Sequence, residues 1–323
     1  MKKFLVIRFS SIGDIVLTSP VLRCLKNTYP NCTIHYLTKA QYAGILANNP
    51  FVDKVYSIKE EIDEISKDLQ SEGYDFVIDL HHNLRTFRLK QKLGKASAAF
   101  PKLNVQKFLL TTFKWNKMPD IHIVDRYFKT VEKLGVVNDQ KGLDFFITEN
   151  DHVNLPEHGI TTPFMAFSIG AQFATKRLTK EKIVSLISKI NAPVVLLGGP
   201  GDKEVGEFIT EQSKNNTINL CGELSLNQSA SVLKQSAKVI SHDTGLMHIA
   251  SAFQKEIISI WGNTVPALGM YPYLPQEGSK YSIHEVELSC RPCSKIGYQQ
   301  CPKKHFKCME NQDLEAISKT INQ

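Results

Sequence analysis

The sequence lacks any apolar run long enough to cross a bilayer, which takes about 20 consecutive apolar residues. It also lacks internal repeats, low-complexity tracts and nucleic-acid-binding signatures such as a helix-turn-helix. The first apolar run stops at Arg8, and no small-residue cleavage site follows it, which argues against a signal peptide. We therefore expect a cytoplasmic globular protein whose chain opens with a buried strand.

Acidic residues are missing from one long stretch. Nine Lys and Arg residues, and no Asp or Glu, lie between Asp79 and Asp120. The chain has a net charge of +7, and most of the excess lies in its first 150 residues. Scattered lysines are usually only solvated, but this asymmetry predicts an anionic partner. A phosphorylated glycan or an anionic lipid ranks above nucleic acid, for which no signature accompanies the charge.

Predicted strands and helices alternate, which is typical of parallel α/β sheets, and 323 residues favour two domains. The predicted strands are Lys3–Phe9, Thr33–Leu37, Val52–Tyr56, Tyr74–Leu80, Phe164–Ile169, Pro193–Leu197, Thr217–Leu220, Lys238–Ser241 and Glu256–Ile260. The predicted helices are Pro20–Thr28, Ala40–Asn48, Glu61–Glu72, Asn83–Leu93, Val105–Phe113, His122–Leu134, Lys180–Ile190, Asp202–Lys214, Leu226–Gln235, Leu246–Phe253 and Asp313–Ile321.

The segment Glu149–Pro163 has no periodicity and is rich in Asn, His, Pro and Gly, so it is the predicted linker. We place the domains at 1–155 and 156–323, with the last helix left free to pack back on the first domain. Ligands of open α/β sheets bind at the C-terminal ends of the strands. Two such sheets predict a ligand cleft between the domains.

The most informative segment runs from Ser241 to Phe253. A short apolar run precedes Asp243-Thr244-Gly245, and apolar residues at helical spacing follow. A carboxylate, a hydroxyl and a glycine therefore stand where a strand ends and a helix begins. The first amides of a helix lack internal partners and its dipole favours anions, so this junction predicts a phosphate site. Aspartic proteases need two such triplets in a β-rich fold, which excludes that class.

Other strand ends carry candidate polar groups. Asp14 follows the first strand, after Gly13, where it either serves function or simply suits the helix dipole. Arg85 follows another strand end and is suited to hold an anionic group, since a guanidinium stays charged. The neighbouring His81 and His82 are candidate bases or ordinary structural histidines. Lys176 and Arg177 follow a third strand end, where two cations suit a diphosphate.

The glycine-rich run Gly198–Gly201 is a weak signal, because it lacks both the P-loop ending and the dinucleotide fingerprint. Glu204 just after it would either hold ribose hydroxyls or cap a helix. Four cysteines near the C-terminus, with His305 as a further ligand, raise the alternatives of a structural Zn²⁺ site or free thiols. These four cysteines are Cys290, Cys293, Cys301 and Cys308.

Taken together, these motifs resemble glycosyltransferase family 9, the bacterial ADP-heptose:lipopolysaccharide heptosyltransferases. The resemblance runs nearly end to end and implies a GT-B arrangement, in which two Rossmann-like domains with parallel sheets face across a cleft. Its anchors are Arg8–Asp14, Asp79–Arg85, Lys176-Arg177, Gly198–Glu204 and Asp243–His248.

The resemblance also implies roles for matching residues. Asp14 would be the catalytic base, and Lys176 would stabilise the donor diphosphate. Asp243 would orient the donor sugar or nearby backbone, and His248 would support that loop. The implied donor-binding residues are Gly13, Gln172, Arg177, Glu204, Asp243, Thr244, Gly245, Leu246 and His248. The implied acceptor-binding residues are His82, Arg85 and Arg88.

The implied activity is inverting transfer of heptose from ADP-L-glycero-D-manno-heptose to the lipopolysaccharide inner core, without a cofactor or catalytic metal. The implied partners are the nucleotide sugar, the phosphorylated lipid A and core oligosaccharide, and the anionic inner membrane, with the protein peripheral to its cytoplasmic face. Three alternatives stay open: a glycosyltransferase for another nucleotide sugar, a nucleotide-sugar epimerase, and a non-catalytic nucleotide-sugar binder.

Overall fold

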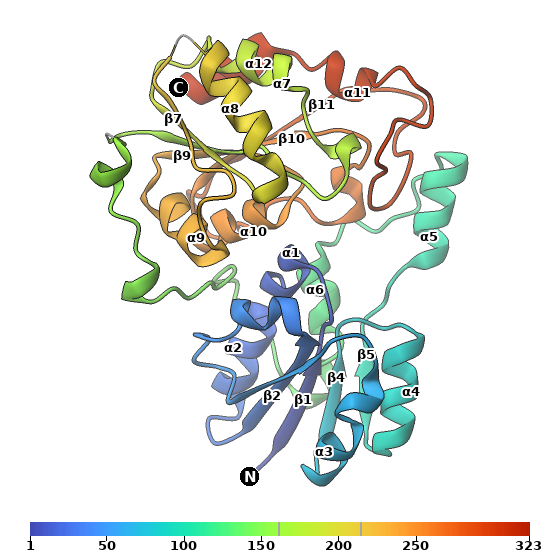
Figure 1. Ribbon diagram of the computed structural model, residues 1–323. Coiled ribbons are helices and arrows are strands. Elements are labelled where there is room, and N and C mark those ends of the chain that lie inside the picture. The colour runs from blue at the N-terminus through green and yellow to red at the C-terminus, as the bar shows by residue number, and fades with distance from the viewer. Residues whose placement is uncertain (161, 214) are drawn as a thin grey trace. The chain divides into compact units, whose positions relative to one another are not determined.

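The computed structural model describes residues 1–160, 162–213 and 215–323, which divide into two compact units (Figure 1). The first unit comprises Met1–Lys102 and Ile121–Phe146, and the second comprises Leu103–Asp120 and Ile147–Gln323. The boundary expected at 155/156 thus lies at 146/147, and a separate segment of the first half joins the second unit. No helix within these described ranges is long and apolar enough to cross a membrane.

The first unit is built on a five-stranded parallel sheet with strand order β3-β2-β1-β4-β5. Its strands are β1 (Lys3–Ile7), β2 (Thr33–Lys39), β3 (Lys54–Ile58), β4 (Phe76–Asp79) and β5 (Ser97–Ala99). Its α-helices are α1 (Ile12–Val16), α2 (Ser19–Thr28), α3 (Ser66–Ser71), α4 (Leu84–Leu93) and α6 (Ile123–Phe128). The last four residues of β1 are fully buried, as expected for a central strand covered on both faces.

The second unit is built on a six-stranded parallel sheet with strand order β11-β10-β9-β6-β7-β8. Its strands are β6 (Met165–Ser168), β7 (Val194–Leu197), β8 (Thr217–Asn219), β9 (Lys238–His242), β10 (Glu256–Trp261) and β11 (Tyr281–Glu285). Its α-helices are α5 (Asn104–Phe108), α7 (Lys180–Ile187), α8 (Lys203–Gln212), α9 (Leu226–Gln235), α10 (Gly245–Ala252), α11 (Lys307–Glu310) and α12 (Leu314–Asn322).

Short helical turns complete the two units. They are the 3-10 turns η1 (Ala40–Ile45), η2 (Ile62–Glu64), η4 (Glu132–Leu134), η5 (Glu149–Asp151), η6 (Leu155–His158), η7 (Ala174–Lys176), η8 (Pro200–Asp202) and η9 (Pro266–Leu268), and the π-helical turn η3 (Leu109–Phe113).

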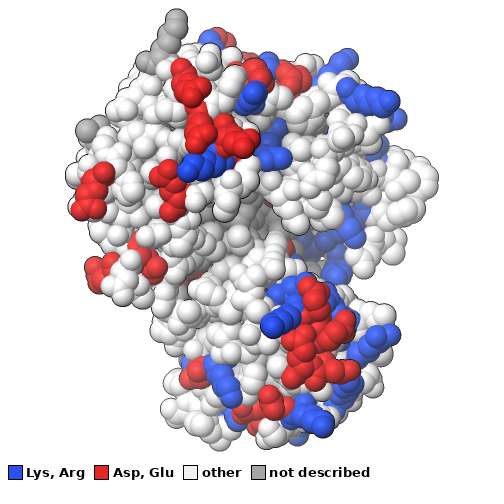
Figure 2. Space-filling model, viewed as in Figure 1, with Lys and Arg blue, Asp and Glu red and all other residues white. Residues whose placement is uncertain are grey.

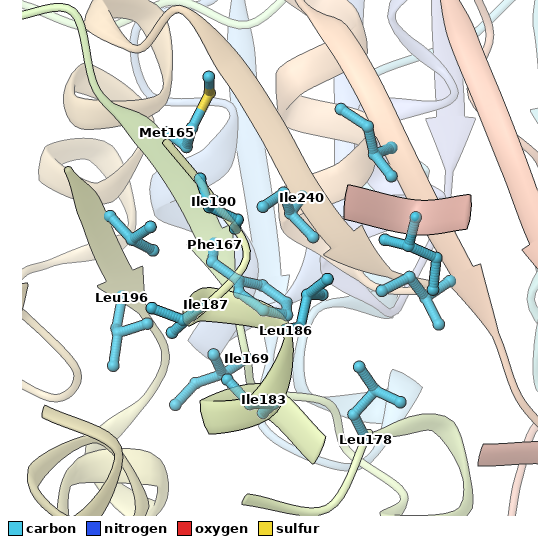
Figure 3. Packing of buried hydrophobic residues seen from close by; sticks show 14 of the residues in the cluster. Met165, Phe167, Ile169, Leu178, Ile183, Leu186, Ile187, Ile190, Leu196 and Ile240 are labelled. Atoms are coloured by element: carbon cyan, nitrogen blue, oxygen red, sulfur yellow. The ribbon is translucent and has the colours of Figure 1, made fainter. Parts of the chain in front are cut away.

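The core of the second unit forms between the central strands and the helices beside them. Figure 3 shows Ile183, Leu186 and Ile187 of α7 lying against Phe167 of β6, and all four side chains are fully or almost fully buried. This packing fixes β6 within the sheet. The loop that follows β6, which carries Lys176, therefore leaves a rigid strand.

Several predicted elements differ from the structure. The last helix, α12, packs on α7 and β10 of its own unit, because Ile317 and Ile321 belong to the core described above. The helix expected at Ala40–Asn48 is the 3-10 turn η1, and the one expected at Glu61–Glu72 is broken into η2 and α3. Strands β5 and β11 were not predicted. Lys214, the predicted end of α8, lies outside the described residues, as does one residue of the predicted linker.

Candidate active site

The central strands β6, β9 and β10 of the second unit are direct neighbours, so the loops after them leave the same edge of the sheet. These loops carry Lys176, Asp243 and Thr264, respectively. The parallel strands thus bring Asp243 into contact with Lys176, which is 67 residues away in sequence, and with Thr264, which is 21 residues away. This edge is where open α/β sheets bind their ligands.

Asp243 is the centre of this group. Its carboxylate accepts hydrogen bonds from the Lys176 ammonium at 2.6 Å and from the Thr264 hydroxyl at 2.9 Å. The Lys176 ammonium also donates to the carbonyl oxygen of Asp243 at 3.2 Å. Asp243 is 9% exposed, so this is a largely desolvated ion pair with additional hydrogen bonds. Asp243 therefore holds the Lys176 ammonium beside the start of α10.

The start of α10 is suited to an anion. Gly245 is its first residue, and the preceding Thr244 makes no capping hydrogen bond with its side chain. The Thr244 hydroxyl lies 3.3 Å from that of Ser241 and 3.5 Å from that of Ser168. Helix amides, a cation and a group of hydroxyls therefore converge on one strand-to-helix junction. This chemistry fits a phosphate or diphosphate.

His242 stabilises the loop that carries Lys176. It is fully buried at the end of β9, and its Nε2 accepts a hydrogen bond from the backbone amide of Leu178 at 3.1 Å. Burial, with a smaller contribution from the positive charge of Arg177, lowers the pKa of His242 to about 3. The imidazole is therefore neutral near pH 7 and acts as a hydrogen-bond acceptor that positions the loop.

A second set of buried polar groups, not predicted from the sequence, fixes the loop after β10. The Arg291 guanidinium donates to the carbonyl oxygens of Gly262 at 2.5 Å and Thr264 at 2.9 Å. The Thr175 hydroxyl donates to the Asn263 side chain at 3.1 Å, which joins this loop to the one that carries Lys176. A signal was present in the sequence, because Gly262–Thr264 follows an apolar run just as Asp243–Gly245 does.

The other predicted donor-binding residues differ in their burial and in their contacts. Arg177 pairs with Asp202 at 3.2 Å, and Asp202 packs so closely on Gly170 that a Cβ at Gly170 would lie 2.2 Å from its carboxylate. Glu204 is exposed in the first turn of α8, and Gln172 is exposed in the loop after β6. His248 is buried within α10, beneath the junction. Leu246 follows Gly245 in the first turn of this helix.

In the first unit, Asp14 sits at the start of α1, next to Gly13, after the end of β1. Its carboxylate accepts hydrogen bonds from the backbone amide of Ser11 at 3.1 Å and the Ser11 hydroxyl at 2.9 Å, forming a capping box. The Arg8 guanidinium lies 2.5 Å from its second oxygen. Desolvation alone would lower the pKa of Arg8, but the nearby Asp14 carboxylate raises it overall. Arg8 is therefore a permanent cation beside the carboxylate.

Aromatic and cationic groups flank this carboxylate. The ring of Phe9 lies 4.9 Å from that of His81, and the Arg85 guanidinium lies 5.4 Å over the Phe9 ring. Burial, with a smaller contribution from Arg8, lowers the pKa of His81 to about 3. Since a base needs a pKa near the working pH, His81 is poorly suited to that role.

The three predicted acceptor-binding residues lie on or just before α4. His82 is exposed, and its Nδ1 lies 2.8 Å from the carbonyl oxygen of Phe100. Arg85 donates to the carbonyl oxygen of Glu60 at 3.0 Å, while Arg88 is exposed. The fully buried Asp79 holds this loop, because its carboxylate accepts from the amide of His82 at 2.6 Å.

The four C-terminal cysteines form no disulfide bond. Cys290 lies 3.7 Å from the ring of His305, and the Cys293 thiol donates to the carbonyl of Cys290 at 3.1 Å. Burial raises the pKa of Cys308 to about 11, which keeps its thiol protonated near pH 7. Within the described part of the chain, no three His, Cys, Asp or Glu side chains are placed to hold a metal ion. The structural zinc site and the free-thiol alternative therefore both stay predictions.

The chain has the GT-B type of fold, with two parallel α/β units, one of which carries a helix start suited to an anion. The model of glycosyltransferase family 9 (heptosyltransferase) matches residues 62–303, three quarters of the chain. The chain belongs to this family.

The relatives agree with this assignment. The lipooligosaccharide heptosyltransferase 2 of Haemophilus influenzae is 26% identical over 317 residues, covering 86% of this chain and 87% of its own. A family 9 glycosyl transferase from Veillonella parvula superposes with a TM-score of 0.73 at 22% identity, covering 87% of this chain and 85% of its own. The E. coli heptosyltransferase WaaC with ADP-2-deoxy-2-fluoro heptose superposes with a TM-score of 0.67 at 19% identity, covering 99% and 98%.

Proposed function

We propose that this protein transfers heptose from ADP-L-glycero-D-manno-heptose to the lipopolysaccharide inner core, with inversion at the anomeric carbon. The observation that carries the proposal is the pairing of Lys176 with Asp243 beside the start of α10, in a chain of the heptosyltransferase family. The names of the relatives supply the sugar and the acceptor class, since diphosphate contacts do not distinguish one sugar from another.

The second unit would hold the donor. The diphosphate would bind at the amides of Thr244, Gly245 and Leu246, with the Lys176 ammonium meeting the negative charge that develops on departing ADP. Asp243 would act through Lys176, by keeping its ammonium aimed at the leaving group. Glu204 would hold the ribose.

The first unit would activate the acceptor. Asp14 would take the proton from the attacking hydroxyl, and Arg85 and Arg88 would bind phosphate groups of the acceptor. Because the Arg8 guanidinium lies 2.5 Å from the Asp14 carboxylate, proton transfer would accompany the bond to the anomeric carbon and not precede it.

Charge stabilisation by Lys176 and by the start of α10 would make a divalent cation unnecessary for the chemical step. The protein would work on the cytoplasmic face of the inner membrane, as a peripheral protein, because its acceptor is anchored there. Treatment with a chelator should therefore leave the initial rate unchanged, and a rate that falls and returns with added metal would contradict this part of the proposal.

The direct test is a panel of nucleotide sugars assayed with and without core-truncated lipopolysaccharide. ADP-heptose should give an elongated acceptor and ADP, and other nucleotide sugars should react far more slowly. Conversion of the sugar without acceptor would show an epimerase. Binding of the donor with no turnover on any acceptor would show a non-catalytic binder.

A further inference from the structure

An exposed apolar surface lies on the second unit, away from the groups assigned above. Val105, Phe108, Phe113 and Trp115 are 68%, 56%, 51% and 61% exposed. The ring of Phe113 lies 5.8 Å from that of Phe108 and 5.5 Å from that of Trp115. The three rings thus form one continuous surface, which we call the aromatic patch. Contiguous apolar patches of this kind usually mark an interaction site.

The segment that carries the aromatic patch is held in place at few points. Neither α5 nor η3 buries much side chain, and Leu110 is the buried residue of the two. Just beyond η3, the Lys114 ammonium donates to the carbonyl oxygens of Thr111 at 2.6 Å and Pro292 at 2.7 Å. In Figure 1, α5 lies clear of the other labelled elements of its unit. The rings are therefore presented outward and are not part of a core.

Positive charge surrounds the patch. Lys107, Lys114 and Lys117 alternate with the aromatic residues, and no acid lies between Asp79 and Asp120. The loop that Lys114 contacts is also acid-free, because Leu288–Met309 holds five Lys and Arg residues and no Asp or Glu. Figure 2 shows the surface at α5 as uncharged, with blue basic atoms beside it.

We propose that the aromatic patch and the lysines around it form a docking surface for an anionic lipid bilayer. Trp and Phe rings favour the headgroup region of a bilayer, while lysines are attracted to anionic headgroups. Lysine is depleted at protein–protein interfaces, which argues against a second copy or a folded protein as the occupant. The inference rests on the proposed membrane location and assigns the residues that produce it.

Tryptophan fluorescence tests the proposal directly. The chain has two tryptophans, and Trp261 is 1% exposed while Trp115 is 61% exposed. Vesicles of phosphatidylcholine with phosphatidylglycerol should shift the emission of the wild-type protein to the blue, and pure phosphatidylcholine vesicles should shift it far less. The Trp115→Phe variant should lose the shift, since buried Trp261 does not report on lipid.

Cosedimentation with the same anionic vesicles gives the affinity. Phe108→Ser with Trp115→Ser should weaken partitioning about tenfold or more, because two rings leave the bilayer. Val137→Ser is the matched control, since Val137 is 77% exposed on the first unit and should have no effect. Lys117→Glu with Lys295→Glu should also weaken binding about tenfold, whereas Lys129→Glu with Lys133→Glu, which changes the charge equally, should not.

Several results would overturn the proposal. The first is that the wild-type protein cosediments with anionic vesicles while the emission of Trp115 does not shift. The second is that the aromatic double variant and the Val137→Ser control partition equally to these vesicles. A blue-shifted Trp115 in a concentration-dependent dimer without vesicles would identify a second copy as the occupant.

The double aromatic variant should transfer heptose normally to a delipidated core oligosaccharide. Failure of the wild-type enzyme on every acceptor would instead refute the proposed function, and would leave the vesicle result standing.

Discussion

Two aspartates in the two units occupy similar local positions but have different surroundings. Asp14 and Asp243 each follow a central strand and precede or begin a helix, and each contacts a cation, at 2.5 Å for Arg8 and 2.6 Å for Lys176. Asp14 belongs to a capping box with Ser11, whereas Asp243 accepts a hydrogen bond from Thr264 in the next loop of the sheet.

On the proposed function, this difference would separate a reacting group from a positioning group. Ser11 and Arg8, which contact the Asp14 carboxylate, come from its own strand end and helix. Lys176 and Thr264, which contact the Asp243 carboxylate, come from two other loops, so Asp243 joins three loops of the proposed donor site. We therefore expect Asp14 to act on the substrate and Asp243 to act through Lys176.

The largest effect is expected for Asp14→Asn, which keeps the size of the side chain but removes the base. The turnover number should fall about 10³-fold, while the affinity for ADP, measured by calorimetry, stays within a few-fold. Asp68→Asn is the control, because Asp68 lies in the first turn of α3 but at no strand end of the proposed site. Near-normal turnover by the Asp14 variant would remove it from the mechanism.

Lys176→Met should lower the turnover number about 10²-fold to 10³-fold and also weaken ADP binding, because the charge on the leaving group loses its cation. Lys180→Met is the matched control, since Lys180 begins α7 and lies over the ring of Phe208 at 3.8 Å. Unchanged ADP affinity in the Lys176 variant would show that its ammonium does not contact the diphosphate.

Asp243→Asn should have a smaller effect, of about tenfold to 10²-fold on turnover, because Lys176 keeps its charge but loses its orientation. Combined with Lys176→Met, it should add almost nothing further. The measurement is a double-mutant cycle, in which the turnover number of the double variant is compared with those of the two single variants. Additive losses would mean that Asp243 contacts the substrate independently of Lys176.

The smallest effect concerns the half-buried His81 and the fully buried His242, whose pKa values are both lowered to about 3. Between that value and the unfolded value of about 6.5, the unfolded chain binds more protons, so acidification should destabilise the fold. Each histidine should contribute a slope on the order of 1.4 kcal/mol per pH unit in this window.

Denaturant unfolding between pH 7 and pH 4.5 measures this slope. His242→Asn and His81→Asn should each make it shallower, whereas the variant of exposed His158 should not change it. An unchanged slope in the two variants would mean that these histidines titrate normally.

The sequence predicted the central strands well because they are buried on both faces. Such strands are nearly continuous apolar runs, as in β1 and β10. It missed β11, an edge strand in which every second residue is exposed, and β5, which has only three residues. The segment Ala40–Asn48 was expected to be a helix, but the structure has the 3-10 turn η1 there. Ile45 is the buried residue of this turn. Local pattern is thus least informative at the edges of the sheets.

The same limit applies to what the sequence predicted of the candidate site. Asp243 and Lys176 stood out because each follows an apolar run, but their pairing depends on the neighbouring positions of β6 and β9 in the sheet. Thr264 was missed because its contact with Asp243 arises only when β10 pairs with β9. Arg291 was missed because the carbonyl oxygens that it binds, those of Gly262 and Thr264, lie 29 and 27 residues earlier in the chain. The sequence motifs therefore identified the groups on two of the three loops, while the sheet order determined which groups meet.

The assignment of Leu103–Asp120 to the second unit has a consequence for protein engineering. A chimaera between this chain and a relative is usually joined at a single point between the domains. Here a single junction near 146/147 would separate this segment, with its aromatic patch, from the unit on which it packs. Three junctions, near residues 102, 120 and 146, would exchange the first unit, with its proposed acceptor-binding residues. The proposed bilayer-docking surface would then stay with the second unit, to which it belongs.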